Sequence, residues 1–491
     1  MEHKKKSIAK NYLYNVSYQI LVMILPIITT PYVSRVLGAE NIGIYSYTLS
    51  ITTFFILFGS LGIALYGQRE IAYLQEDKKR YSITFWEIFI LRCITMAISI
   101  IVFYFVFAIG NNDYNLYYKI LIIELIGNVI DISWFFQGLE EFKKTVLRNT
   151  FVKLIGLVLI FTLVKDSNDL PIYFGIYVLS TFLGNLSLWF YLPKYLAKIK
   201  FSELKIFRHL KPTIELFIPQ IAVQVYTLLD KTMIGTIIAD KSEVGYYEQS
   251  QKIVKILLSL ITSLGTVMLP RIASTFAEGN NKKVKQYMKN SFNLVFLLAF
   301  PLMMGLISVS DAFVPFFFGN GYEKVSTIMK VICPIILFIG LSNVTGTQYL
   351  LPTKRQKEFT ISVICGAVVN FIINSLLIPK YASIGASIGT VIAEFTVTSV
   401  QMYYTRKDFE IGKVIALSKN YILSSLIMFV FCMVTGHFIN NNVISIIAQI
   451  FVGIVSYFLV LSILKDEFFN KIFSSITSKL HKKKKIFKIW K

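Results

Sequence analysis

The sequence predicts an all-α polytopic membrane protein of about fourteen transmembrane helices, arranged as two pseudo-symmetric six-helix lobes followed by two C-terminal helices. Of the 491 residues, 55% are hydrophobic and only 16% are charged, whereas soluble domains carry roughly a quarter charged residues. Apolar runs long enough to cross a bilayer recur from residue 11 to residue 464. Short motifs of the first half return in the second half. This composition excludes a soluble enzyme and a secreted disulfide scaffold.

A transmembrane helix needs roughly 20 mostly apolar residues. Fourteen segments meet this requirement, although the fifth and thirteenth are short and need to extend into flanking residues. The expected spans are 12–37, 43–66, 83–109, 116–137, 149–164, 172–192, 213–238, 244–270, 291–309, 326–351, 359–378, 384–405, 420–436 and 443–464.

The distribution of Lys and Arg predicts the orientation, because the cytoplasmic loops of membrane proteins are enriched in both. With the N-terminus inside, the inner segments hold 38 of the 50 basic residues and the outer loops hold four. We therefore expect a multi-pass protein of the bacterial cytoplasmic membrane with both termini in the cytoplasm. The net charge of +22 then reflects topology and attraction to anionic membrane lipids, and it requires no nucleic acid.

An internal repeat predicts the domain organisation. Residues 42–45 match residues 244–247, and residues 60–62 match residues 263–265, at an offset of about 202. Further on, Gln137 matches Gln348 at an offset of 211. Six spans separate equivalent positions, so the two copies are parallel and related by an axis along the membrane normal. We expect an N-terminal lobe at 1–211, a C-terminal lobe at 212–406, helices 13 and 14 at 407–464, and a basic cytoplasmic tail at 465–491.

Several segments resemble signatures of the Wzx-type oligosaccharide flippase family. These are DISWFFQGLEEFKK at 131–144, LPTKRQK at 351–357, PYVSRVLG at 31–38 and GYYEQSQKIV at 245–254. The resemblance covers nearly the whole chain. It implies a MATE-like fold of the MOP superfamily and a cargo of undecaprenyl-diphosphate-linked oligosaccharide repeat units. These would move from the inner to the outer leaflet for capsule, O-antigen or teichoic-acid-like polymer synthesis, with a polymerase and other assembly proteins as partners.

A diphosphate cargo calls for cations inside the membrane, where an unneeded charge costs roughly 3 kcal/mol or more. Arg suits phosphate because its planar fork donates two hydrogen bonds at once. The candidates for binding the diphosphate or glycan are Arg35, Arg92, Lys231, Lys252 and Lys255. Each has a structural alternative: Lys252 follows Glu248 by one helical turn, Lys231 adjoins Asp230, and Arg92 could pair with Glu124 or Asp131.

Transport against a gradient needs a coupling group, and the sequence offers intramembrane acids for a proton or Na⁺. The candidates are Glu124, Asp131, Asp230 and Glu394, each of which could instead neutralise a buried cation. Arg69 and Arg271 lie at equivalent inner ends of two spans and are expected to act as an inner-face gate. The four Cys and four His are scattered, so we expect no metal site and no cofactor.

Three other functions compete with the flippase. A MATE-type multidrug exporter would favour acids in the lumen, but residues 11–37 contain none and present Arg35. A lipid II flippase of the same superfamily carries a related cargo. A membrane-embedded polymerase or glycosyltransferase is disfavoured, because its paired catalytic carboxylates and a phosphate-binding loop are missing from the sequence. We therefore expect no enzymatic activity, and the sequence does not identify the glycan.

Overall fold

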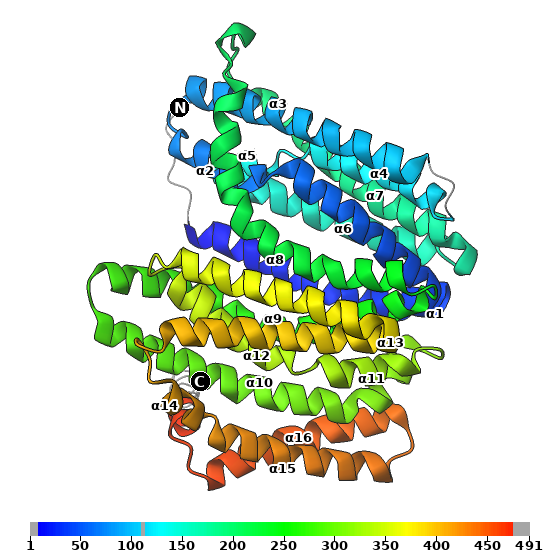
Figure 1. The fold of residues 1–491 in the computed structure, drawn as a ribbon, viewed down its shortest axis with the longest axis vertical. Helices are drawn as coiled ribbons and strands as arrows, with labels where there is room; N and C mark the ends of the chain where they lie inside the picture. Colours follow the sequence, from blue (N-terminus) through cyan, green and yellow to red (C-terminus); the bar gives the residue numbers. More distant parts are fainter. Residues whose placement is uncertain (1–7, 110–112, 475–491) are drawn as a thin grey trace, which may run out of the picture. The chain divides into compact units, whose positions relative to one another are not determined.

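The structure is a computed structural model that describes residues 8–109 and 113–474, and these residues form helices joined by short loops (Figure 1). They divide into two compact units, residues 1–248 and 249–491, and each unit is described by itself. The domain boundaries expected from the repeat, at 211/212 and 406/407, stay predictions.

The first unit contains eight α-helices and the beginning of a ninth among its described residues. They are α1 (Ile8–Ser60), α2 (Ile63–Tyr73), α3 (Lys78–Phe103), α4 (Asn115–Val129), α5 (Ser133–Gly138), α6 (Phe142–Leu163), α7 (Leu170–Ser187), α8 (Leu210–Ile237) and α9 (Ser242–Ala277). A π-helical turn, η1 (Tyr104–Ala108), follows α3. Short 3₁₀ turns are η2 (Ser167–Asp169), η3 (Leu188–Phe190), η4 (Leu192–Lys194), η5 (Phe201–Glu203) and η6 (Ile206–His209). We call residues 188–209, which contain η3–η6 and join α7 to α8, the connector.

The second unit begins inside α9 and continues with seven further α-helices in its described part. They are α10 (Asn281–Phe318), α11 (Glu323–Ile332), α12 (Ile335–Ser342), α13 (Gln356–Thr405), α14 (Ile411–Leu417), α15 (Lys419–Phe438) and α16 (Asn442–Ile463). A π-helical segment, η7 (Asn343–Leu350), extends α12.

The membrane helices confirm the predicted fold class. Eleven helical segments of the described chain are long and apolar enough to cross a membrane. Two of them contain a non-helical residue, Gly38 (φ 78°) in α1 and Ala382 (φ 50°) in α13. At about 1.5 Å per residue the 53-residue α1 would be roughly 80 Å long against a core of roughly 30 Å, so each of these helices is two spans. Counting both halves of α1 and α13 gives thirteen spans, and the 28-residue α8, which contains most of the expected span 213–238, brings the described part of the chain to the fourteen that the sequence predicts.

An aromatic cluster fixes α2 and α3 against α5 in the first unit. Trp134 and Phe85 are fully buried, with ring centroids 5.5 Å apart, and Phe135 packs edge-on against Phe85 at 4.8 Å. Such pairs contribute roughly 0.5–1.5 kcal/mol each beyond their buried area. A glycine allows the close approach of α2, because a Cβ on Gly67 would lie 2.4 Å from the indole of Trp134. The aromatic part of the 131–144 signature is therefore core.

The same turn is built once in each unit. Helix α6 begins two residues after Glu140 (φ 58°), and α13 begins two residues after Lys354 (φ 63°). Two backbone hydrogen bonds correspond as well: Glu141 to Phe136 at 2.7 Å and Arg355 to Leu350 at 2.8 Å. The turns are thus 214 residues apart, from 140 to 354, which is three more than the sequence match at 211 indicates. At these turns the two copies share the backbone conformation although their residues differ.

We expect Gly67→Ala to lower the thermal stability of the protein. The new methyl group would overlap Trp134, and overpacking a core typically costs about 1–3 kcal/mol. Gly175→Ala is the matched control, because a methyl group added there, inside α7, would have no atom within 4 Å and would raise helix propensity. Thermal unfolding of the two purified variants in detergent compares them, and equal melting temperatures would contradict the packing argument.

Candidate functional site

Arg92 is the most buried of the predicted cargo-binding cations. It lies on α3 with 3% of its surface exposed, inside a membrane span. Its Nε and Nη1 atoms have no hydrogen-bond partner in the described part of the chain. Neither of its expected partners, Glu124 or Asp131, forms an ion pair with it there, although the charge of Asp131 acts on it at longer range. A buried guanidinium with unused donors can donate them to an anionic acceptor, and the cargo-binding role of Arg92 stays a prediction.

Lys231 is paired within the first unit. Its ammonium contacts the Glu248 carboxylate, which links α8 to the start of α9. The neighbouring Asp230 is 1% exposed and accepts a hydrogen bond from the Tyr247 hydroxyl. The alternative of an ion pair is therefore realised for Lys231, with Glu248 and not with the adjacent Asp230.

The other predicted cations differ in exposure. Arg35 on α1 and Lys255 on α9 are exposed, and Lys252 on α9 is half-buried. Each of the three has interactions of its own. Arg35 belongs to the first unit, whereas Lys252 and Lys255 belong to the second.

The predicted acids occupy different environments. Glu124 on α4 is 5% exposed, and its Oε2 has no hydrogen-bond partner among the described residues. Asp131 instead accepts a hydrogen bond from the Ser133 backbone at 2.9 Å, which supports the start of α5. Glu394 on α13 is 3% exposed and lies in the second unit. Glu124 therefore has the free acceptor that a proton-carrying acid needs.

The two predicted gate residues lie in different units. Arg69 on α2 is exposed, pairs with Glu70 at 3.2 Å and lies 5.6 Å from the centre of the Tyr66 ring. Arg271 on α9 is exposed as well. Their gate function stays a prediction.

Two glycines of the internal repeat meet at a close helix crossing in the first unit. A Cβ on Gly43 of α1 would lie 1.7 Å from the carbonyl oxygen of Lys241, and a Cβ on Gly245 of α9 would lie 2.1 Å from that of Ala39. Gly43 and Gly245 are 202 residues apart, and so are Ala39 and Lys241. Each repeat copy therefore touches the other through equivalent backbone atoms. We call this contact the glycine crossing.

The glycine crossing is a contact between backbones, and the side chains around it form hydrogen bonds elsewhere. The Lys241 ammonium donates to the carbonyl oxygens of Gly235 at 2.7 Å and Ile238 at 2.9 Å, so it caps the end of α8. Further along α1, the Ser50 hydroxyl lies 2.8 Å from the Thr232 hydroxyl of α8. The sequence identifies the two glycines as repeat equivalents but contains no signal that they touch.

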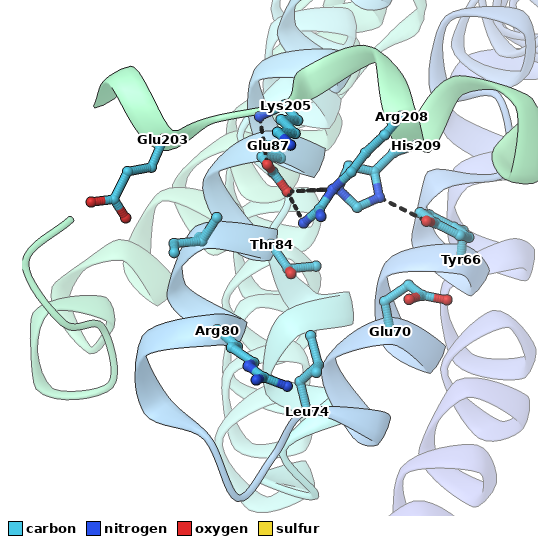
Figure 2. Close-up of a pocket in the computed structure, with 11 residues that line it drawn as sticks. Tyr66, Glu70, Leu74, Arg80, Thr84, Glu87, Glu203, Lys205, Arg208 and His209 are labelled. Atoms are coloured by element: carbon cyan, nitrogen blue, oxygen red, sulfur yellow. Dashed lines mark hydrogen bonds and ion pairs between the residues drawn. The ribbon is translucent and has the colours of Figure 1, made fainter. Parts of the chain in front are cut away.

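A polar pocket of about 630 Å³ lies between α2, the first turns of α3 and the connector (Figure 2). At its centre the Glu87 carboxylate, 1% exposed, accepts hydrogen bonds from the Lys205 backbone at 2.6 Å and from Arg208 Nε at 3.1 Å. It also lies 2.8 Å from His209 Nε2, and the other ring nitrogen lies 2.7 Å from the Tyr66 hydroxyl. Glu87 thus holds the end of the connector on α3.

Sequence reasoning misses this network. It places Glu87 only within the third span, and it treats His209 only as one of four scattered histidines. An acid in an apolar run is the available signal, because such a residue is rarely buried without a partner. Its partners cannot be identified from the sequence, since they lie 118 to 122 residues further along the chain.

His209 carries a pH-dependent part of the stability. Burial lowers its pKa, the hydrogen bond to Glu87 and the charge of Glu87 oppose this, and the Arg208 guanidinium adds to the lowering. The folded protein therefore takes up a proton at His209 less readily than the unfolded chain. Stability is lost as the pH falls through the ordinary histidine pKa of roughly 6.5.

We expect wild-type protein to lose more thermal stability than His209→Gln when the pH falls from about 7.5 to about 5.5, because only the wild type has this group to protonate. Melting temperatures of both proteins in detergent at the two pH values give the difference. His437→Gln, at the end of α15, is the control for a histidine in the second unit. An equal loss in wild type and His209→Gln would show that His209 is not held neutral.

Comparison with known proteins agrees with the fold and the motifs. Residues 8–276 match the family model "Polysaccharide biosynthesis protein", and residues 146–465 match that of "Lipid II flippase MurJ". A "Putative O-antigen transporter" of Escherichia coli (strain K12) is 26% identical over 83% of this chain and 99% of its own length. "Capsular polysaccharide biosynthesis protein CapF" of Staphylococcus aureus is 24% identical over 82% and 100%.

Solved structures share the architecture. "Lipid II flippase MurJ, inward closed conformation" has a TM-score of 0.75 at 20% identity and covers 92% of this chain and 98% of its own. An inward-facing multidrug resistance MATE transporter of the MOP superfamily has a TM-score of 0.61 at 14% identity, with 83% and 96% covered. These similarities show the fold. Together with the family match over more than half of the chain, they establish that this membrane protein belongs to the polysaccharide biosynthesis protein family and has the fold shared by MurJ and the MATE transporters.

Proposed function

We propose that the protein moves undecaprenyl-diphosphate-linked oligosaccharide repeat units from the inner to the outer leaflet of the bacterial cytoplasmic membrane by alternating access. The cargo would feed synthesis of a capsule, an O-antigen or a teichoic-acid-like polymer. Family membership and the names of the O-antigen and capsule relatives support this class of cargo. Both termini then lie in the cytoplasm, as the distribution of Lys and Arg indicates. Anionic membrane lipids, a polymerase and other assembly proteins are the proposed partners.

The single observation that carries the proposal is the unsatisfied guanidinium of Arg92. A buried charge is costly, and two of its donor atoms have no partner among the described residues. A diphosphate supplies several charged acceptor oxygens, so binding it would satisfy these two donor atoms of Arg92. In this proposal Arg35, Lys252 and Lys255 add further positive charge along the route. Lys231 would contribute only after leaving Glu248.

Energy for the cycle would come from a proton or Na⁺ gradient. Glu124 is the strongest candidate for the coupling acid because its Oε2 is buried without a hydrogen-bond partner in the described chain. Glu394 and Asp230 are alternatives of similar burial, whereas Asp131 is engaged with the backbone of α5. No other cofactor is proposed.

The lipid II flippase is the second candidate, because residues 146–465 match the MurJ family model. Its cargo shares the lipid-linked sugar chemistry, so the glycan that accumulates distinguishes the two. Depletion of the protein in its native cell, followed by sided analysis of lipid-linked glycans, tests both. Complete polymer repeat units held on the inner leaflet would support the proposal, and accumulation on the outer leaflet would contradict it.

We expect Arg92→Gln to reduce flipping of the lipid-linked oligosaccharide in proteoliposomes by about 10- to 100-fold, because hydrogen bonds to a charged group contribute roughly 1.5–3 kcal/mol. Arg92→Lys should retain part of the activity. The melting temperature of Arg92→Gln should stay equal to or above that of wild type, since the substitution removes a buried charge that has no ion-pair partner in the described chain. A large fall in melting temperature would instead indicate a structural role.

The glycine crossing would act as a closing contact in the proposed transport cycle. With the N-terminus inside, it lies at the outer end of the first unit, so it would close the outer side and separate when cargo is released. We expect Gly43→Ala to favour separation, because its methyl group would overlap the Lys241 carbonyl.

The measurement is the labelling of Ala39→Cys by an impermeant thiol reagent added from outside, in a background without the four native cysteines. Labelling should rise several-fold when Gly43→Ala is added. Gly305→Ala, whose added methyl group would make an ordinary contact at 3.9 Å, is the control. Unchanged labelling in the Gly43→Ala protein would exclude a closing role for the crossing.

A further inference from the structure

The inner pocket of the first unit has walls that are fixed before any ligand arrives. Glu87 joins α3 to the connector through Lys205 and Arg208, and the Tyr66–His209 contact joins α2 to the connector (Figure 2). Its volume of about 630 Å³ lies within the range of roughly 300–1,000 Å³ typical of small-molecule sites. A pre-formed site loses little conformational entropy on binding. None of the predicted cargo-binding cations lines it.

The side chains that line the pocket include both hydrogen-bond donors and acceptors, and their positive and negative charges balance. Its lining has three cations, Arg80, Lys205 and Arg208, and three acids, Glu70, Glu87 and Glu203. A phosphate would meet the acids and an amine would meet the cations, so the lining has no net preference for either. A ligand with many uncharged hydroxyl groups fits this pattern, because each hydroxyl both donates and accepts.

One hydroxyl that lines the pocket has no partner in the described part of the protein. Thr84 is 2% exposed, lines the pocket, and makes no hydrogen bond among the residues that the structure describes. Most threonines of this chain's helices donate to a carbonyl one turn back, as Thr48 and Thr52 do. A hydroxyl that lines a pocket and has no partner in the described chain is free to donate to and accept from a ligand there.

We propose that this pocket binds sugar residues of the cargo glycan on the cytoplasmic side, separately from the cations that bind the diphosphate. The proposal rests on the proposed function, and it assigns the pocket to the part of the glycan beyond the first sugar. Because α3 begins at Lys78, near the inner membrane surface in the proposed topology, the pocket lies where a glycan projecting into the cytoplasm would reach it. The pocket would thereby admit complete repeat units in preference to incomplete ones.

The test compares two forms of the same cargo in proteoliposomes. The lipid-linked oligosaccharide is extracted from cells depleted of the protein, and part of it is trimmed enzymatically to its first sugar. Thr84→Val, which keeps the shape and removes the hydroxyl, and Lys205→Gln are the test variants. Lys211→Gln is the control, because it is exposed at the start of α8 and does not line the pocket.

We expect Thr84→Val to slow flipping of the complete cargo by about five-fold, the effect of one lost hydrogen bond, and to leave the trimmed cargo unaffected. Equal loss for both cargoes would overturn the proposal, because it would place Thr84 in folding or gating. No loss for either cargo would overturn it too. The control variant should flip both cargoes at the wild-type rate.

A binding measurement separates this proposal from the proposed function. The glycan is released from the extracted lipid by mild acid, and ligand-observed NMR follows its binding to purified wild type and Thr84→Val in detergent. Binding that is weakened several-fold in Thr84→Val supports the pocket even if wild type flips neither cargo, a result that would contradict the flippase alone. Equal binding by both proteins, or binding by neither, overturns the pocket assignment.

Discussion

The cost of placing an unpaired charge or polar group away from water shapes the whole molecule. Each helix satisfies its own backbone, and a charge within a span is stabilised by a partner of opposite charge, as Lys231 is by Glu248. Arg92 departs from this rule, with two donor atoms left unpartnered in the described chain. Glu124 departs from it with one acceptor atom. These two charged exceptions lie in the first unit, and the proposed transport of an anionic lipid would use both.

The sequence predicted those features that depend on residues near one another along the chain. Span length, the loop distribution of Lys and Arg, and the buried Arg92 all follow from local composition. Features that depend on residues far apart in the sequence could not be predicted. Glu87 contacts His209, 122 residues further along the chain, only because the connector folds back onto α3. Asp131 also accepts a hydrogen bond from the Ser133 backbone at the start of α5, and its coupling or pairing role stays a prediction.

The internal repeat shows which part of a duplicated sequence keeps its structure. At the turns before α6 and α13 the backbone hydrogen bonds coincide at a spacing of 214, although the side-chain match suggested 211. Residues 60–62 break the chain between α1 and α2, whereas their equivalents at 263–265 lie inside the continuous helix α9. The turn before α6 is thus repeated before α13, whereas the break between α1 and α2 is not repeated in α9. The two copies therefore differ in structure at equivalent sequence positions.

The two ends of the first unit are held by different kinds of contact, and this difference determines which end can open at lower cost. Pulling the connector from α3 would leave the buried carboxylate of Glu87 without its donors, which is strongly unfavourable. At the glycine crossing the contact is between backbones, and the nearby hydroxyls of Ser50 and Thr232 also bond to carbonyls of their own helices. Separation there leaves no polar group of those residues unsatisfied. Separating the crossing therefore costs less than pulling the connector away from Glu87.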